Sequence, residues 1–92
     1  MARVTIRIPA VLQPYAEGQS QLETEAATVE EALARLCEAH ERLRPRLFEP
    51  EGRLRRFVNV FVGDTRVRND GGLVRPLGTG DVVTILPAVA GG

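Results

Sequence analysis

The sequence predicts an α+β fold in which one helix packs on a sheet built from five short strands. Three observations lead to this prediction. The N-terminal segment has the two-residue apolar alternation of a half-buried strand, and one central segment has helical periodicity. Glycine-containing turns separate the remaining strands. The predicted order of elements is strand, strand, helix, strand, strand, strand.

The composition indicates one soluble domain. The chain has 92 residues, enough for one domain and too few for two. Twelve acidic residues balance twelve basic ones, so we expect neither nucleic acid nor a membrane as a partner. The single cysteine, Cys37, excludes an internal disulfide, and the N-terminus has no apolar run that could be a signal peptide. We therefore expect a cytoplasmic protein.

The first two strands are predicted to form a hairpin. In "RVTIRI" (residues 3–8) the apolar residues point to one face and the intervening residues to the other. Pro9 and Pro14 discourage continuation of this strand. After a turn at Gly18, a more polar second strand is expected from about Ser20 to Glu25.

The segment "TVEEALARLCEAH" predicts the helix. Thr28 and Glu31 have the spacing of a capping box, in which two side chains satisfy free N–H groups of the first turn. Pro45 is expected to end regular helix nearby, and residues 49–56 around Gly52 are expected to form a surface loop. The buried face is predicted to contain Val29, Ala32, Leu33, Leu36, Cys37 and His40.

The C-terminal half predicts three further strands. "RFVNVFVGDTRVR" has the pattern of a hairpin with a tight turn at Gly63 and Asp64. "LVRPL" then predicts a short helical turn, and the last strand is expected from about Asp81 to Leu86. Pro87 lacks the N–H group needed for further pairing. The domain is therefore expected to span residues 1–86, with an extended tail at residues 87–92.

No group of residues predicts a self-sufficient active site. His40 lies near the helix end, where a partly buried structural histidine is more common than a metal ligand. Cys37 falls on the apolar helix face, where a core cysteine is the default. The glycine-containing turns do not open a long helix after a strand, as phosphate loops do. We expect no bound metal or cofactor, and we expect the protein not to be an enzyme.

The densest basic stretch favours a solvated loop surface, with RNA or phosphate contact as the alternative. Nearby Glu41, Glu49 and Glu51 dilute its charge. The stretch contains six arginines: Arg42, Arg44, Arg46, Arg53, Arg55 and Arg56.

One face of the sheet is predicted to carry a docking patch. If the alternating valines of residues 58–62 point toward the helix, then Phe57, Phe61 and Leu86 point outward beside Arg7. Large apolar side chains clustered on an open face are typical of a partner-binding surface. The alternative is that a loop covers this face.

The last residues, "PAVAGG", predict a reactive tail. Pro87 favours an extended Leu86, and two glycines could thread a slot that any Cβ would block. The reactive group would be the unhindered carboxylate of Gly92. Adenylation by an ATP-using partner would make this carboxylate an acyl donor, and attack by sulfur would then leave a thiocarboxylate.

The pattern "GD-x-V-x-I-x-P-x-x-x-G-G", at the end of a strand–helix–strand domain, resembles the ubiquitin-like (β-grasp) sulfur carriers. These include the thiamine carrier, the small subunit of molybdopterin synthase and the carrier of a cysteine-forming pathway. The resemblance covers nearly the whole chain, and its specific part is Leu77 to Gly92. "RFVNVFV" together with "VTILPAVAGG" is most similar to the cysteine-biosynthetic carrier.

The resemblance implies that a ubiquitin-activating-type enzyme uses ATP to adenylate and thiocarboxylate Gly92. It also implies a PLP-dependent, cysteine synthase-like enzyme as sulfur acceptor and a zinc metallopeptidase that regenerates the carrier. Phe61 falls where the family has an exposed sheet residue, and Leu86 matches the outward residue six before the terminal glycine. The expected partner-binding residues are Gly91, Ala90, Val89, Leu86, Phe61, Phe57 and Arg7.

Other functions remain open at this point. A molybdopterin-synthase subunit would need a permanent large partner, and a carrier could serve another sulfur-containing metabolite. A ubiquitin-like protein modifier would instead form isopeptide bonds with target lysines. A pure interaction module would use Phe57 and Phe61 and give the tail no role, which the tail sequence argues against.

Overall fold

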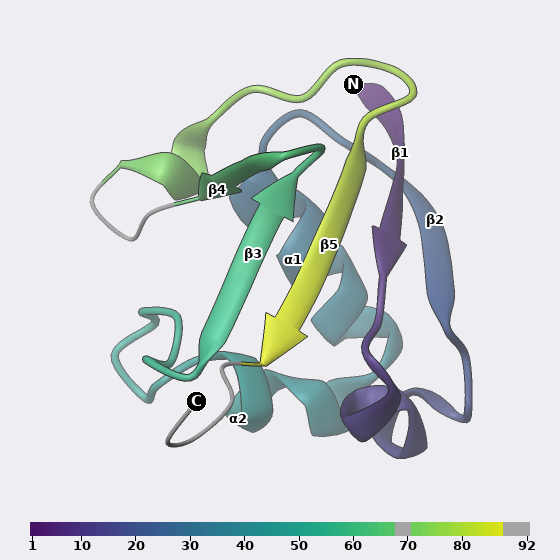
Figure 1. Cartoon of the computed structure of the whole chain (residues 1–92), viewed down its shortest axis with the longest axis vertical. Coiled ribbons are helices and arrows are strands. Elements are labelled where there is room, and N and C mark those ends of the chain that lie inside the picture. The colour runs from purple at the N-terminus through teal and green to yellow at the C-terminus, as the bar shows by residue number, and fades with distance from the viewer. Residues whose placement is uncertain (68–70, 88–92) are drawn as a thin grey trace.

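A five-stranded mixed sheet with one long helix on a single face forms the frame of the computed structural model (Figure 1). The structure describes residues 1–67 and 71–87. The helix is α1 (Val29–Ala39). The strands are β1 (Ala2–Arg7), β2 (Gln21–Ala26), β3 (Val58–Val62), β4 (Thr65–Val67) and β5 (Val82–Pro87). This order confirms the predicted α+β arrangement.

The strand β5 lies at the centre of the sheet, whose order is β2-β1-β5-β3-β4. It pairs in parallel with β1 and antiparallel with β3, so the first and last strands of the described chain are neighbours. Gly80, at φ +95°, turns the chain into β5, and its N–H donates to the Arg3 carbonyl at 2.9 Å. A glycine suits this turn because a side chain would be strained at such a φ.

The two hairpins differ in how their strands are connected. β3 and β4 meet through the predicted tight turn, in which Gly63 has φ +57°. β1 and β2 pair antiparallel as expected, but the 3-10 helix η1 (Ala10–Ala16) lies between them and was not predicted. The Gln13 side chain donates to the Ile8 carbonyl at 3.0 Å and joins η1 to the end of β1.

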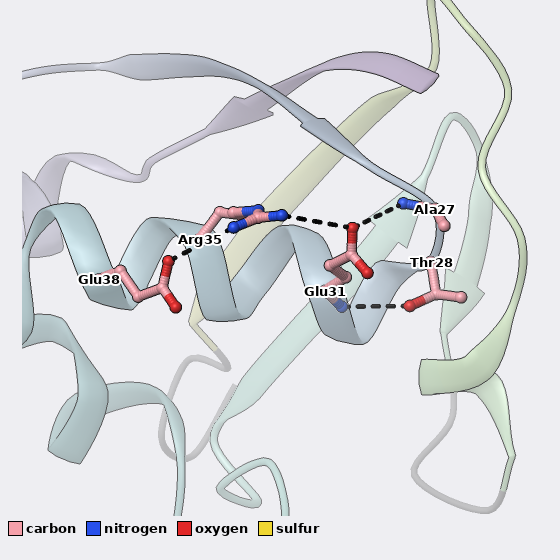
Figure 2. Close-up of polar contacts among 5 residues, drawn as sticks. All are labelled: Ala27, Thr28, Glu31, Arg35 and Glu38. Carbon is pink, nitrogen blue, oxygen red and sulfur yellow. Dashed lines mark hydrogen bonds and ion pairs between the residues drawn. The ribbon is translucent and has the colours of Figure 1, made fainter. Parts of the chain in front are cut away.

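The start of α1 confirms the predicted cap (Figure 2). The N–H of Glu31 donates to the Thr28 hydroxyl at 3.2 Å, and Glu31 in turn accepts from the N–H of Ala27 at 3.2 Å. The second bond therefore reaches one residue before the N-cap. The guanidinium nitrogens of Arg35 lie 3.8 Å from Oε1 of Glu31 and 3.8 Å from Oε1 of Glu38. Exposed ion pairs of this kind contribute little to the free energy of unfolding.

The core lies between α1 and the inner face of the sheet. The predicted helix face is buried, except that His40 is the half-buried C-cap residue, whose ring nitrogen lies 3.3 Å from the Gln19 side-chain oxygen. Fully or almost fully buried side chains from both layers meet here: Val4, Ile6, Val29, Leu33, Leu36, Val60, Val83 and Ile85.

The prediction that Pro45 ends the helix is wrong. The helix α1 ends at Ala39 and is followed by η2 (Glu41–Leu43) and α2 (Arg44–Leu47). Pro45 lies in the first turn of α2. Backbone N–H groups in this turn have no acceptor within the helix, so the lack of an N–H costs nothing there, and the fixed φ of proline suits a helix. The predicted turn at "LVRPL" is confirmed as η3 (Gly72–Val74).

The last strand extends one residue further than predicted. Pro87 is the final residue of β5, with Val58 as its Cα partner. Proline lacks only the backbone N–H donor, and the last residue of a strand can lack this hydrogen bond without disrupting the pairing of the residues before it. Residue 87 therefore belongs to the sheet rather than to the tail.

Replacing Thr28 by Ala should lower the free energy of unfolding by about 1 kcal/mol, because the N–H of Glu31 loses its acceptor. Chemical denaturation monitored by circular dichroism measures this change. Thr79→Ala, at an exposed turn position, is the matched control and should change stability by less than about 0.5 kcal/mol. Equal effects of the two substitutions would contradict the assigned cap.

Candidate functional site: the open face and the end of β5

The face of the sheet opposite α1, called here the open face, carries a row of side chains across four strands. The register pairs Arg7 with Thr84, Thr84 with Phe61, and Phe61 with Arg66. In Figure 1 α1 lies behind β3 and β5, so the viewer looks onto the open face. An apolar ring therefore lies between two arginine positions on one surface.

Leu86 extends this row toward the end of β5. Its side chain is 46% exposed, whereas its neighbour Ile85 is buried against the helix side. Phe61 is half-buried, and together with Leu86 and Thr84 it lines an open hollow that Gly63 and Asp64 complete. The structure thus brings together Phe61, Leu86 and Arg7 as the strand alternation predicted.

Phe57 does not join this group. It lies in a turn before β3, in which the Val58 N–H donates to the Arg55 carbonyl at 3.0 Å. Its side chain is 66% exposed and lines a separate hollow with Pro45, Arg46, Arg55 and Val58. The prediction of one patch with both phenylalanines is therefore wrong. Strand alternation places a residue only where the strand continues, and β3 begins at Val58.

The predicted tail residues Val89, Ala90, Gly91 and Gly92 lie outside the described residues. The described chain reaches Pro87, which pairs with Val58 at the end of β3. The hollow that Phe57 lines includes this same Val58. The last described residue therefore lies between the open face and the Phe57 hollow.

The arginine-rich stretch is more ordered than a solvated loop would be. The guanidinium carbons of Arg42 and Arg46 lie 4.9 Å and 4.3 Å from the centre of the Tyr15 ring. The Arg55 Nε–H donates to the Pro45 carbonyl at 2.6 Å. Cation–π contacts depend on folding that brings residues 15 and 46 together, so the sequence pattern alone did not predict them.

Cys37 has the properties of a core residue, as predicted. Its side chain is fully buried, and burial raises the pKa of its thiol above the ordinary value, a shift that the charge of Arg44 opposes. A buried, protonated thiol is a poor nucleophile. Within residues 1–67 and 71–87, no three His, Cys, Asp or Glu side chains are grouped to hold a metal ion.

The described helices are all too short or too polar to cross a membrane.

The sequence model of the ThiS family matches residues 6–92. The chain belongs to the ThiS family. Its mixed sheet with one packed helix is the ubiquitin-like β-grasp fold, which confirms the predicted fold class.

The ThiS-family relatives include named sulfur carriers. The sulfur carrier protein CysO of Mycobacterium tuberculosis is 42% identical over 97% of this chain and 98% of its own length. A crystal structure of CysO from this organism has a TM-score of 0.84 at 40% identity, covering 94% of this chain and 99% of that one. This similarity confirms the resemblance to CysO-type sulfur carriers.

Two solved structures broaden the comparison. A chain in the BexX/CysO complex of Amycolatopsis orientalis is 43% identical, with a TM-score of 0.85 over 97% of this chain and 99% of that one. The small archaeal modifier protein 1 of Methanosarcina acetivorans is 28% identical, with a TM-score of 0.85 over 100% of this chain and 98% of that one. The β-grasp frame of this ThiS-family chain therefore also resembles that of a modifier.

Cys37→Ala should lower the free energy of unfolding by about 1 kcal/mol, because it removes a small buried group. Because folding raises the thiol pKa, the unfolded state releases its proton first as pH rises. The Cys37 contribution to stability is therefore present below the ordinary thiol pKa of 9.0 and is lost above it.

Denaturation curves of both proteins, compared between neutral and alkaline pH, measure this effect. The stability difference between wild type and Cys37→Ala should shrink as pH rises through that range. A thiol reagent should label Cys37 only after denaturant is added, and rapid labelling of the native protein would contradict its assigned burial.

Proposed function

We propose that this chain is a sulfur carrier protein whose reacting group is the carboxylate of Gly92. The observation that carries the proposal is the similarity to sulfur carrier CysO along 98% of that protein's length. The two glycines at positions 91 and 92 supply an unhindered acyl group. A carrier presents such a group to partner enzymes and needs no active site of its own.

The proposed chemistry takes place in two steps on a partner enzyme. A carboxylate oxygen of Gly92 attacks the α-phosphorus of ATP, pyrophosphate leaves, and an acyl adenylate forms. A sulfide equivalent supplied by the partner then attacks the carbonyl carbon, and AMP leaves. The product is a thiocarboxylate at Gly92. After its sulfur has been transferred to an acceptor, water hydrolyses the remaining acyl bond and restores the carboxylate.

In this proposal the sheet presents the tail to the partner enzyme, because the tail follows directly after β5. β5 is paired with β1 as far as Thr84 and with β3 as far as Pro87, so the position of Pro87, the residue before the tail, is held by the sheet. Leu86 and Phe61 would then anchor the activating enzyme on the open face. Arg7, in the same row, would add an electrostatic attraction that salt weakens.

Three partners fit this role. A ubiquitin-activating-type enzyme would load the sulfur, a PLP-dependent cysteine synthase-like enzyme would accept it, and a zinc metallopeptidase would release the regenerated carrier. The CysO of Amycolatopsis orientalis occurs in a complex with BexX, which supports work through partner proteins. ATP and PLP would be bound by these partners and not by the carrier.

A protein modifier is the second candidate, because a small archaeal modifier protein shares the fold at 28% identity. Both roles begin with adenylation of a C-terminal glycine, and they diverge at the acceptor. A modifier would leave its chain attached to lysine side chains, and a carrier would leave free thiocarboxylate. Immunoblots of host extracts for higher-mass conjugates distinguish the two.

Deletion of Gly92, or Gly91→Val, should reduce ATP–pyrophosphate exchange by the adenylating enzyme of the same organism to background. The reason is that a Cβ, or a displaced carboxylate, would not fit a slot shaped for glycine. Gly78→Ala is the control, because a Cβ there meets only Asp81 Oδ2 at 3.9 Å. Undiminished exchange with both tail variants would exclude Gly92 as the reacting group.

Leu86→Ala and Phe61→Ala should each raise the KM of the adenylating enzyme for this protein. Large apolar anchors in an interface typically cost about 1–2 kcal/mol when truncated, which is roughly tenfold in affinity. Val11→Ala, at another exposed apolar position in η1, is the control and should leave KM unchanged. The docking role is wrong if all three variants have the wild-type KM.

A further inference from the structure

We propose that the hollow lined by Pro45, Arg46, Arg55, Phe57 and Val58 is a second docking surface, which binds an acidic edge of the adenylating enzyme. We call it the arginine corner. This inference rests on the proposed function and adds the chemistry of the partner surface, which the open face does not specify.

The position of the arginine corner brings it to the same partner as the tail. Val58 lines the hollow and is also the Cα partner of Pro87, the last described residue of β5. Phe57 is the next residue before Val58 and so lies beside the point where the tail leaves the sheet. An enzyme that takes up the tail would therefore approach the end of β5 beside which this hollow lies.

The charge of the arginine corner favours an acidic partner. The two charged residues that line this hollow, Arg46 and Arg55, are both basic, in a chain whose net charge is zero. Among the described residues, neither Arg46 nor Arg55 forms an ion pair with a carboxylate. Both guanidinium groups are thus free to bind carboxylates, for which their planar geometry is suited.

The two arginines are also held in place before binding. Arg46 stacks on Tyr15 at 4.3 Å, and Arg55 donates its Nε–H to the Pro45 carbonyl at 2.6 Å. The remaining N–H groups of each guanidinium stay available to a partner. Ordering them in advance reduces the entropy that binding would otherwise cost.

Phe57 supplies the apolar part of the surface. Phe57 is 66% exposed at the rim of a charged hollow, where a protein partner would bury its ring. Aromatic residues, including phenylalanine, and arginine are enriched in protein–protein interfaces. Single-stranded RNA would also bind arginines, but it favours several stacking aromatics along a basic groove, and this hollow has one.

The test is the kinetics of ATP–pyrophosphate exchange by the adenylating enzyme of the same organism, with the carrier as varied substrate. Arg46→Glu should raise KM about tenfold at low ionic strength, leave kcat nearly unchanged, and lose most of this effect at high salt. Phe57→Ala should raise KM at both salt concentrations, because its contribution is apolar.

Arg42→Glu is the matched control. It makes the same change in charge and also removes a contact with Tyr15, at 4.9 Å, but Arg42 does not line the hollow. Its KM should change less than about twofold. Equal effects of Arg42→Glu and Arg46→Glu on KM, or no effect of either, would overturn the arginine corner. The proposed function would still stand in that case, provided that the wild-type protein supports exchange. Absence of exchange with the wild-type protein would overturn both.

A fluorescence anisotropy titration with a labelled single-stranded RNA oligonucleotide tests whether the arginine corner binds RNA instead of a protein. We expect no binding at physiological salt. Binding that Arg46→Glu abolishes, together with an unchanged KM, would assign the surface to RNA and overturn the proposal.

Discussion

The pairing of β5 with β1 on one side and β3 on the other is the constraint on which the rest of the structure depends. It sends Val83 and Ile85 into the core against α1 and leaves Thr84 and Leu86 on the open face. One alternating strand thus supplies both the stability of the domain and its predicted docking residues. A register slip of one residue would exchange the two sets, so the hydrophobic core itself holds the open face in place.

The same strand also positions the residue that precedes the proposed reactive tail. Its last residue, Pro87, is paired with Val58 of β3 and follows Leu86 of the open face, while Val58 also lines the hollow at Phe57. A partner that engages the tail would meet an apolar surface on one side and a basic one on the other. Two different surfaces beside one tail would let several enzymes recognise the carrier through different combinations of contacts.

The sequence predicted what depends on local pattern. The five strands, the Thr28 cap and the outward positions of Phe61 and Leu86 all follow from periodicity within a few residues. It failed where one residue type suits two structures or where distant segments meet. Pro45 could end a helix or begin one, Phe57 lay just outside its strand, and the stacking of Arg46 on Tyr15 exists only in the folded chain.

The central claim is that the carboxylate of Gly92 carries sulfur, and intact-mass spectrometry of the protein purified from its own host tests it most directly. We expect a population whose mass is higher by the replacement of one oxygen with sulfur. Fragmentation should place that change at Gly92, and incubation with the sulfur acceptor should remove it. Sulfur found on the Cys37 side chain, or a protein that is never modified during growth, would contradict the account.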